Sequence, residues 1–245
     1  GNEEVGYYNA AYRIKDVMVS IVTSLGAVLL PRLSYYIENN MRDKFNDILS
    51  KSTQFIFILS LPLVVFCILF AKPSVLILAG SAYSGSIVPL QVLALIIFIV
   101  GLSNLTGIQM LIPLKKEKYL CYSVVIAAVI NMVLNLILIP EYGAIGAAVS
   151  VMVAESSILI YQIYILRAYS QVLFGGVSYM RIIMALALAI CVSIWLNINL
   201  NYNEVIVFLV SASLFFICYL GILLLSKEPF IFTILNQIRS KLTKN

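Results

Sequence analysis

Three charged residues, Arg13, Lys15 and Asp16, lie inside the first apolar run of the sequence. A membrane helix that began after them would span only Val17 to Leu30, about 21 Å at 1.5 Å per residue, which is too short for a hydrocarbon core of about 30 Å. We therefore expect all three charges at membrane depth. A charge there costs about 2.5–3.5 kcal/mol, and it persists only where it faces protein or a water-filled cavity.

The spacing of these charges allows two interpretations. Arg13 and Asp16 are three residues apart, so they share a helical face and can form an ion pair, whereas Lys15 points about 200° away from Arg13. In the functional interpretation, the three residues belong to a cavity whose cationic lining binds an anionic substrate. In the structural interpretation, Asp16 neutralises Arg13 within the bundle, and Lys15 extends its ammonium to a lipid headgroup.

Polar side chains also occur inside two later apolar runs. Glu155 lies midway along residues 144–166, and an ionisable group at that depth is either coupled to an ion or hydrogen-bonded to a neighbouring helix. Asn131 and Asn135 are four residues apart on one face of residues 119–139, a pattern that favours hydrogen bonding between helices. For these residues the sequence leaves ion coupling and helix contact as alternatives.

The residue types argue against most enzyme chemistry. The chain has no histidine, which removes the commonest general base and metal ligand. Its four cysteines lie in apolar runs without the spacing of a zinc site, so we expect neither a metal site nor a disulfide. No glycine-rich phosphate loop is present. We therefore expect no catalytic residues, no cofactor and no enzyme activity, with coupling to a proton or sodium ion left open.

The composition is that of a membrane protein. Hydrophobic residues make up 62% of the chain and charged residues only 11%, whereas a soluble domain carries about 25% charged residues. Runs of about 20 apolar residues can cross a bilayer as helices. We predict an all-α, polytopic membrane bundle of about seven helices, at residues 5–30, 52–71, 88–112, 119–139, 144–166, 180–200 and 204–225.

Basic residues predict the orientation of these helices. Of the 16 Lys and Arg residues, Lys72 alone lies in a loop on one side, two lie within the first run, and the others lie in loops on the opposite side. That basic side is expected in the cytoplasm, together with the C-terminus, so the net charge of +5 requires no nucleic acid. There we predict an amphipathic loop at 32–51, which contains a short helix lying at the lipid surface, and an interfacial helical tail at 226–245. Residues 72–87, on the other side, are expected to form an irregular loop.

Five stretches in the first two thirds of the chain carry a family resemblance. They are Val5-Gly6-Tyr7-Tyr8-Asn9-Ala10-Ala11-Tyr12-Arg13-Ile14, Leu29-Leu30-Pro31-Arg32-Leu33-Ser34, Phe70-Ala71-Lys72-Pro73, residues 131–140 and residues 142–148. In this order and spacing they resemble the second half of the polysaccharide and O-antigen flippases. These belong to the multidrug/oligosaccharidyl-lipid/polysaccharide exporter superfamily. Residues 167–245 resemble that family only as further hydrophobic helices.

The resemblance implies an alternating-access transporter with two helical lobes, in which residues 1–245 form most of the C-terminal lobe. The chain starts without Met and almost directly in an apolar run, which also suggests a piece of a longer protein. The implied substrate is a polyprenyl-diphosphate-linked oligosaccharide, which crosses to the outer leaflet of a bacterial or archaeal plasma membrane for surface polysaccharide biosynthesis. Membrane lipid and glycan polymerase machinery are further expected partners.

The resemblance also bears on one residue. In related lipid II flippases an arginine at the position of Arg13 lines the cavity, and an acidic residue stands just before it. Here that preceding position is Tyr12, so the local pairing of Arg13 must differ, with Asp16 as the candidate replacement.

Two other functions remain as alternatives. A multidrug exporter of the same superfamily often carries cationic substrates, which a lining formed by Arg13 and Lys15 disfavours. A membrane-bound glycan polymerase or acyltransferase usually needs a large extracytoplasmic loop or a catalytic histidine, and the sequence has neither.

Overall fold

The computed structural model describes residues 1–24, 26–199 and 204–233. In that part of the chain the regular secondary structure is helical and contains no strand. Six of its helices are long and apolar enough to cross a membrane. The chain divides into two compact units, unit 1 at Gly1–Gly175 and unit 2 at Gly176–Asn245. These findings confirm the predicted all-α membrane bundle.

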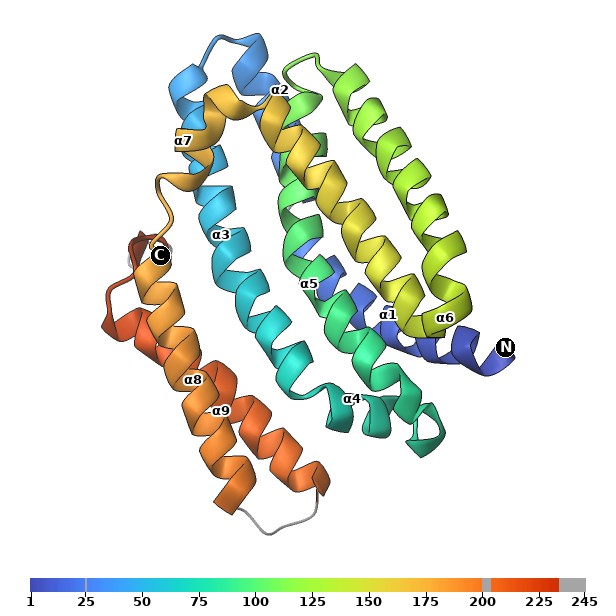
Figure 1. Ribbon diagram of the computed structural model, residues 1–245. Helices are drawn as coiled ribbons and strands as arrows, with labels where there is room; N and C mark the ends of the chain where they lie inside the picture. The colour runs from blue at the N-terminus through green and yellow to red at the C-terminus, as the bar shows by residue number, and fades with distance from the viewer. Residues whose placement is uncertain (25, 200–203, 234–245) are drawn as a thin grey trace. The chain divides into compact units, whose positions relative to one another are not determined.

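Unit 1 consists of long helices joined by short helical turns (Figure 1). The α-helices are α1 (Asn2–Thr23), α2 (Gly26–Glu38), α3 (Arg42–Leu69), α4 (Ala71–Leu78), α5 (Ile87–Asn104), α6 (Glu117–Ile165) and α7 (Ser170–Phe174). The others are the 3-10 helices η1 (Ser81–Ser86) and η3 (Arg167–Tyr169), and the π-helix η2 (Leu105–Leu111), which continues α5.

The centre of unit 1 is α5, whose sequence is apolar on every side, as expected of a helix surrounded by protein. Leu90, Leu93, Ile96 and Ile97 are each at most 1% exposed. Helices α1, α3 and α6 pack around α5. This central helix is therefore the support against which the outer helices are positioned.

Helix α6 turns back on itself at Gly143 (Figure 1). The backbone there has φ 50° and ψ −125°, a conformation that glycine adopts readily and other residues rarely do. We call residues 117–140 the first arm of α6 and residues 144–165 the second arm. One of the six long helical segments, Asn2–Glu38, comprises α1 and α2. Because α6 supplies two arms, the six segments match the seven predicted apolar runs in number.

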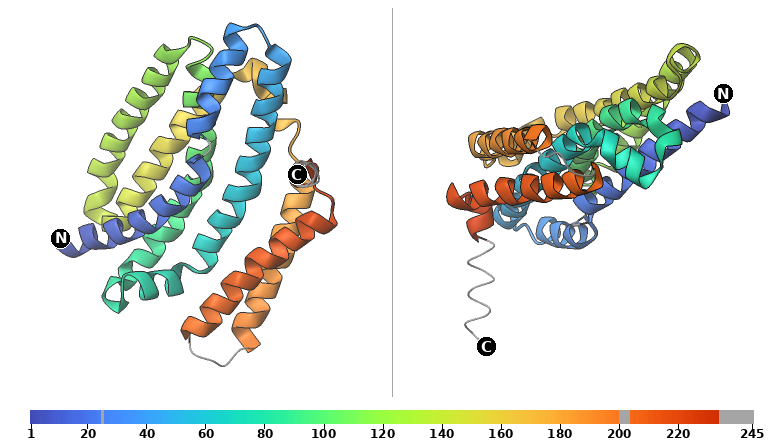
Figure 2. Two further views of the ribbon diagram at one scale, coloured as in Figure 1. Left: turned by 180° about the vertical axis from the view of Figure 1, so that it is seen from behind. Right: turned by 90° about the horizontal axis from the view of Figure 1, so that it is seen from below.

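The first predicted span, at residues 5–30, is wrong as a single helix. Helix α1 ends at Thr23 and α2 begins at Gly26, and the two point in different directions (Figure 2). Hydropathy alone could not reveal this change, because both helices are apolar along the same run.

The amphipathic helix predicted within the loop at 32–51 is present, but it does not lie on the lipid surface as a separate helix. Helix α2 continues to Glu38, and α3 begins at Arg42 without a break before its membrane span. Phe45 and Leu49 are 1% and 0% exposed, so the apolar face of this segment packs into unit 1 rather than onto lipid. A surface helix and the buried start of a long helix share one periodicity, and the sequence could not separate them.

The segments at 72–87 and 226–245 remain to be compared with the predictions. Most of the irregular loop expected at 72–87 is helical, because α4 and η1 occupy it. In the tail at 226–245, a helical turn covers residues 229–233, and residues 234–245 lie outside the described part.

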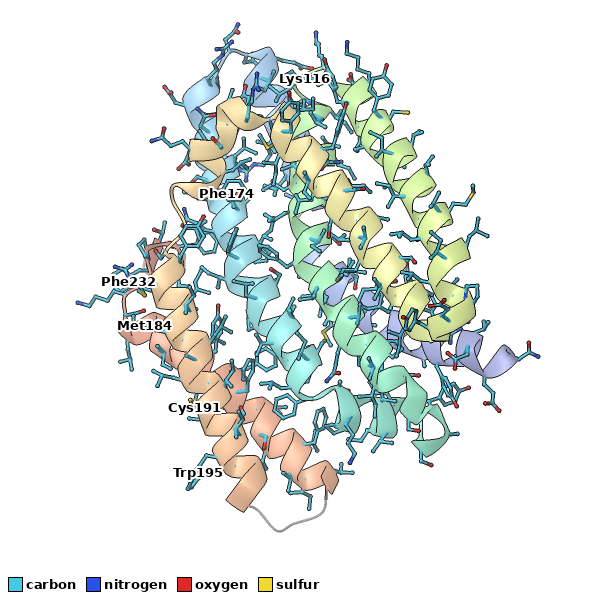
Figure 3. The ribbon with its side chains drawn as sticks, viewed as in Figure 1. Lys116, Phe174, Met184, Cys191, Trp195 and Phe232 are labelled. Atoms are coloured by element: carbon cyan, nitrogen blue, oxygen red, sulfur yellow. The ribbon has the colours of Figure 1, made fainter. Side chains whose placement is uncertain are left out.

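Unit 2 contains α8 (Tyr179–Asn199) and α9 (Glu204–Leu225), which pack against each other. Ala185 and Ala189 of α8, and Phe215 of α9, have no exposed surface, and small residues on α8 allow α9 to approach closely. Met184, Cys191 and Trp195 lie along an exposed side of α8 (Figure 3). This division into small buried and large exposed residues fits a helix pair in lipid.

Candidate functional site

A cavity of about 590 Å³ opens between α1 and the segment formed by α4 and η1. One face of α1 provides most of its wall. The lining residues are Gly6, Asn9, Ala10, Arg13, Ile14 and Val17 from α1, with Leu78, Ala79 and Tyr83 opposite. We call this space the Arg13 cavity.

Aromatic packing holds η1 against α1 at the mouth of this cavity. The rings of Tyr7 and Tyr83 meet edge to face, with centroids 6.4 Å apart. The Tyr7 ring also lies on Gly85, where a Cβ atom would come within 2.7 Å of it. Gly85 thus permits the close approach that places Tyr83 opposite the α1 face.

Arg13 is exposed to the Arg13 cavity. Within the described part of the chain, its guanidinium forms no ion pair or hydrogen bond, so the pairing with Asp16 allowed by the spacing is not made. The guanidinium is therefore a cation with five free N–H donors, and such a group binds phosphate or carboxylate through two parallel hydrogen bonds.

Asp16 pairs with Lys15 rather than with Arg13. Lys15 is only 4% exposed. Its Nζ lies 3.5 Å from the Asp16 carboxylate and 3.8 Å from the centre of the Tyr12 ring. A buried ammonium gains more from a carboxylate and an aromatic face than an exposed one does, which explains why Lys15 is the paired cation. Lys15 and Asp16 are thus occupied with each other, outside the lining of the Arg13 cavity.

Glu155 lies on the second arm of α6 and is half-buried. The second arm packs against α1: Ala11 and Ala148 share one buried cluster, and Met152 packs against it. Glu155 thus follows this contact on the second arm as Lys15 follows it on α1, whereas Arg13 lies on the other side of α1 and lines the Arg13 cavity.

Asn131 and Asn135 line a second cavity, of about 330 Å³, between the start of α1 and the reversal of α6. Asn135 Nδ2 donates to Asn131 Oδ1 at 3.3 Å, so this hydrogen bond joins two residues of one arm rather than two helices. Asn135 Oδ1 is buried without a hydrogen-bond partner. Glu155 does not line this cavity.

Glu4 contributes a contact that the sequence did not reveal. One of its carboxylate oxygens accepts a hydrogen bond of 2.7 Å from the backbone N–H of Ala144, at the start of the second arm. The amide groups at a helix start lack partners within the helix and favour negative charge. Glu4 therefore caps the second arm from α1. Gly143, which follows Pro140 closely, was the sequence signal for a reversal that would expose such amides.

A buried polar network closes the opposite end of unit 1, and the sequence did not reveal it either. Thr106 of η2 donates to Gln162 Oε1 at 2.6 Å, and Gln162 Nε2 donates to Ser123 Oγ at 3.3 Å. All three side chains are at most 1% exposed. The network joins η2 to both arms of α6. It lies toward the end that carries the turn before α6, where Figure 3 shows Lys116.

The chain is similar to membrane transport proteins of known families. Residues 4–219 match the family described as lipid II flippase MurJ. The "Putative O-antigen transporter" of Escherichia coli K12 is 24% identical over 155 residues, which cover 63% of this chain and 37% of that protein. The "Probable low-salt glycan biosynthesis flippase Agl15" of Haloferax volcanii is 24% identical over 151 residues, which cover 60% of this chain and 31% of that protein. The chain thus spans about a third of the length of these relatives.

Proposed function

This chain belongs to the lipid II flippase MurJ family, and from that premise we propose that it forms part of a flippase for a polyprenyl-diphosphate-linked oligosaccharide. The flippase moves its substrate from the cytoplasmic to the outer leaflet of a bacterial or archaeal plasma membrane. The names of the two relatives, an O-antigen transporter and a glycan biosynthesis flippase, support this class of cargo.

The observation that carries the proposal is the unpaired guanidinium of Arg13 in a large cavity at a membrane-spanning helix. A diphosphate is strongly anionic, and the planar fork of an arginine matches two of its oxygens. The Arg13 cavity also offers the amide of Asn9 and the ring of Tyr83, which suit a sugar or a phosphate ester. In the proposed mechanism, Arg13 binds the diphosphate, water in the cavity solvates the sugars, and the polyprenyl chain stays in lipid.

The same guanidinium disfavours export of cationic drugs. A permanent positive charge that has no counter-ion among the described residues repels a cationic substrate. No carboxylate of the described residues lines the Arg13 cavity, and Asp16 pairs with Lys15 instead.

The test is transport by the longer protein that carries this chain, scored per molecule of membrane-inserted protein. We expect Arg13→Ala to lower transport by about tenfold or more, because a charged hydrogen bond is worth about 1.5–3 kcal/mol. Arg13→Lys should retain part of the activity, because a single ammonium replaces a two-pronged contact. Arg32→Ala is the matched control, since Arg32 is exposed on α2 outside the cavity. Wild-type transport by Arg13→Ala would refute the proposal.

We further propose that the end of unit 1 carrying Lys115, Lys116 and Lys118 lies in the cytoplasm, because basic loops stay on that side. The turns between α2 and α3 and between η2 and α6 lie at this end (Figure 1). A cysteine introduced at Glu117 in a cysteine-free background should resist a membrane-impermeant reagent added to intact cells. Rapid labelling from outside would place this end of unit 1 on the outer side of the membrane and contradict the proposal.

A further inference from the structure

Arg13 and Lys15 are two residues apart on α1 and have opposite environments. Arg13 is exposed to the Arg13 cavity, whereas Lys15 is 4% exposed on the side of α1 that packs into the unit. Whatever holds Lys15 in place also determines which way Arg13 points, because both side chains leave the same rigid helix. The contacts of Lys15 are therefore contacts that can orient Arg13.

The nearest partners of Lys15 cannot orient α1. Asp16, at 3.5 Å, and the Tyr12 ring, at 3.8 Å, both belong to α1 itself. They neutralise and shield the ammonium, but they move with the helix. Glu155 differs because it lies on another helix, the second arm of α6, which packs against α1 next to Lys15. Ala11 of α1 and Ala148 of the second arm share one buried cluster, and Met152 packs against it one turn before Glu155.

The spacing of two residue pairs supports a register between α1 and the second arm. Glu4 of α1 caps the second arm at Ala144. Lys15 lies eleven residues after Glu4, and Glu155 lies eleven residues after Ala144. Eleven residues make about three helical turns at 3.6 residues per turn, so on each helix the second residue returns to the face of the first. The cap and the positions of Lys15 and Glu155 thus lie on one face of each helix, in matching register.

We propose that Lys15 is a positioning residue: with Glu155 it fixes the rotation of α1 and thereby keeps Arg13 directed into the Arg13 cavity. This role rests on the proposed function for its purpose, but the orientation itself exists without substrate. Arg13 is the binding group, and Lys15 acts only through it.

The experiment measures which way α1 faces. Asn9 lies four residues before Arg13 and lines the same cavity, so a cysteine in its place reports on the cavity face. Asn9→Cys is introduced into the cysteine-free, full-length protein in lipid nanodiscs, and its reaction rate with a water-soluble maleimide is measured without substrate. A separate Glu117→Cys protein, labelled at the opposite end of unit 1, reports general unfolding.

Removing either charge should turn the cavity face away from water. We expect Lys15→Met and Glu155→Gln each to slow labelling at position 9 by about 3- to 15-fold, the range that intramembrane polar contacts support. Lys15→Arg should keep the rate within about twofold, because it retains the charge. The matched control is Asp16→Asn, which removes the closer carboxylate but should leave the rate unchanged because Asp16 belongs to α1.

A charge reversal completes the test. In the Asp16→Asn background, Lys15→Glu alone should slow labelling, and adding Glu155→Lys should restore it. An unchanged rate in Lys15→Met, an equal slowing by Asp16→Asn, failure of the reversed pair to restore the rate, or a parallel change at position 117 would each overturn the positioning role. These rates do not depend on transport, so they stand even if Arg13→Ala transports normally, and the transport test likewise stands without them.

Discussion

The two ends of unit 1 differ in how tightly they are packed. At the end where α6 reverses, α1 borders cavities of about 590 and 330 Å³. Toward the other end, a cavity lined by α1, α2, α3, α5 and η2 holds only about 10 Å³, and Thr106, Gln162 and Ser123 form a buried polar network. The difference indicates that one end holds the helices tightly together, whereas the other leaves room for a ligand beside α1.

At the open end, the largest effect on stability is expected from a substitution at Gly143, where α6 reverses. Alanine at Gly143 would hold a side chain at φ 50° and would collide with the capping carboxylate of Glu4. We expect Gly143→Ala to lower the free energy of unfolding by about 2–4 kcal/mol, from backbone strain together with loss of the cap. The measurement is the thermal unfolding midpoint of the purified protein.

Gly221 provides the matched control for that substitution. It lies within α9, and a Cβ atom there would meet nothing within 4 Å. Gly221→Ala should be neutral or stabilising by up to about 1 kcal/mol, because alanine favours helix over glycine. If both substitutions shift the midpoint equally, the reversal does not depend on glycine.

At the closed end, Gln162 is the residue on which the network depends. Gln162→Ala would remove two hydrogen bonds and leave a space beside Gly107. We expect a loss of about 1–3 kcal/mol in the free energy of unfolding. Gln54→Ala serves as the comparison, because Gln54 bonds only to Ser50 of its own helix and should cost less than about 1 kcal/mol. A smaller loss for Gln162→Ala than for Gln54→Ala would show that the closed end is not held by this network.

The smallest expected effect is that of the cap from α1. Glu4→Ala should cost about 0.5–2 kcal/mol, the usual range for loss of a helix cap. Glu3→Ala is matched in charge and position but should have almost no effect, because Glu3 is exposed and caps nothing in the described residues. Equal unfolding midpoints for the two variants would show that the Glu4 cap does not stabilise the second arm.

The sequence predicted the membrane spans better than the way they pack. Apolar run length is a local property, so α3, α5 with its continuation η2, α8, α9 and both arms of α6 were predicted correctly within a few residues, except at the extended start of α3. The change of direction between α1 and α2 was missed, since hydropathy carries no directional information. The buried start of α3 was taken for a surface helix for a similar reason: periodicity locates an apolar face without saying what covers it.

The charged residues show the same limit at the level of single side chains. Helical spacing correctly separated Arg13 from Lys15 and showed that Arg13 and Asp16 could meet. It could not show which cation would be buried, because burial depends on α5 and α6 packing against one side of α1. The proposed link between Lys15 and Glu155 joins residues far apart in the chain, and no local pattern encodes it.

The central claim, that Arg13 binds the diphosphate of a lipid carrier, is tested most directly by binding. Affinity for a polyprenyl diphosphate and for the corresponding monophosphate is measured with the full-length protein in nanodiscs, for the wild type, Arg13→Ala and Arg32→Ala. We expect Arg13→Ala to weaken diphosphate binding by about 10- to 100-fold, with a smaller effect on the monophosphate and none from Arg32→Ala. Diphosphate affinity unchanged in Arg13→Ala would contradict the account.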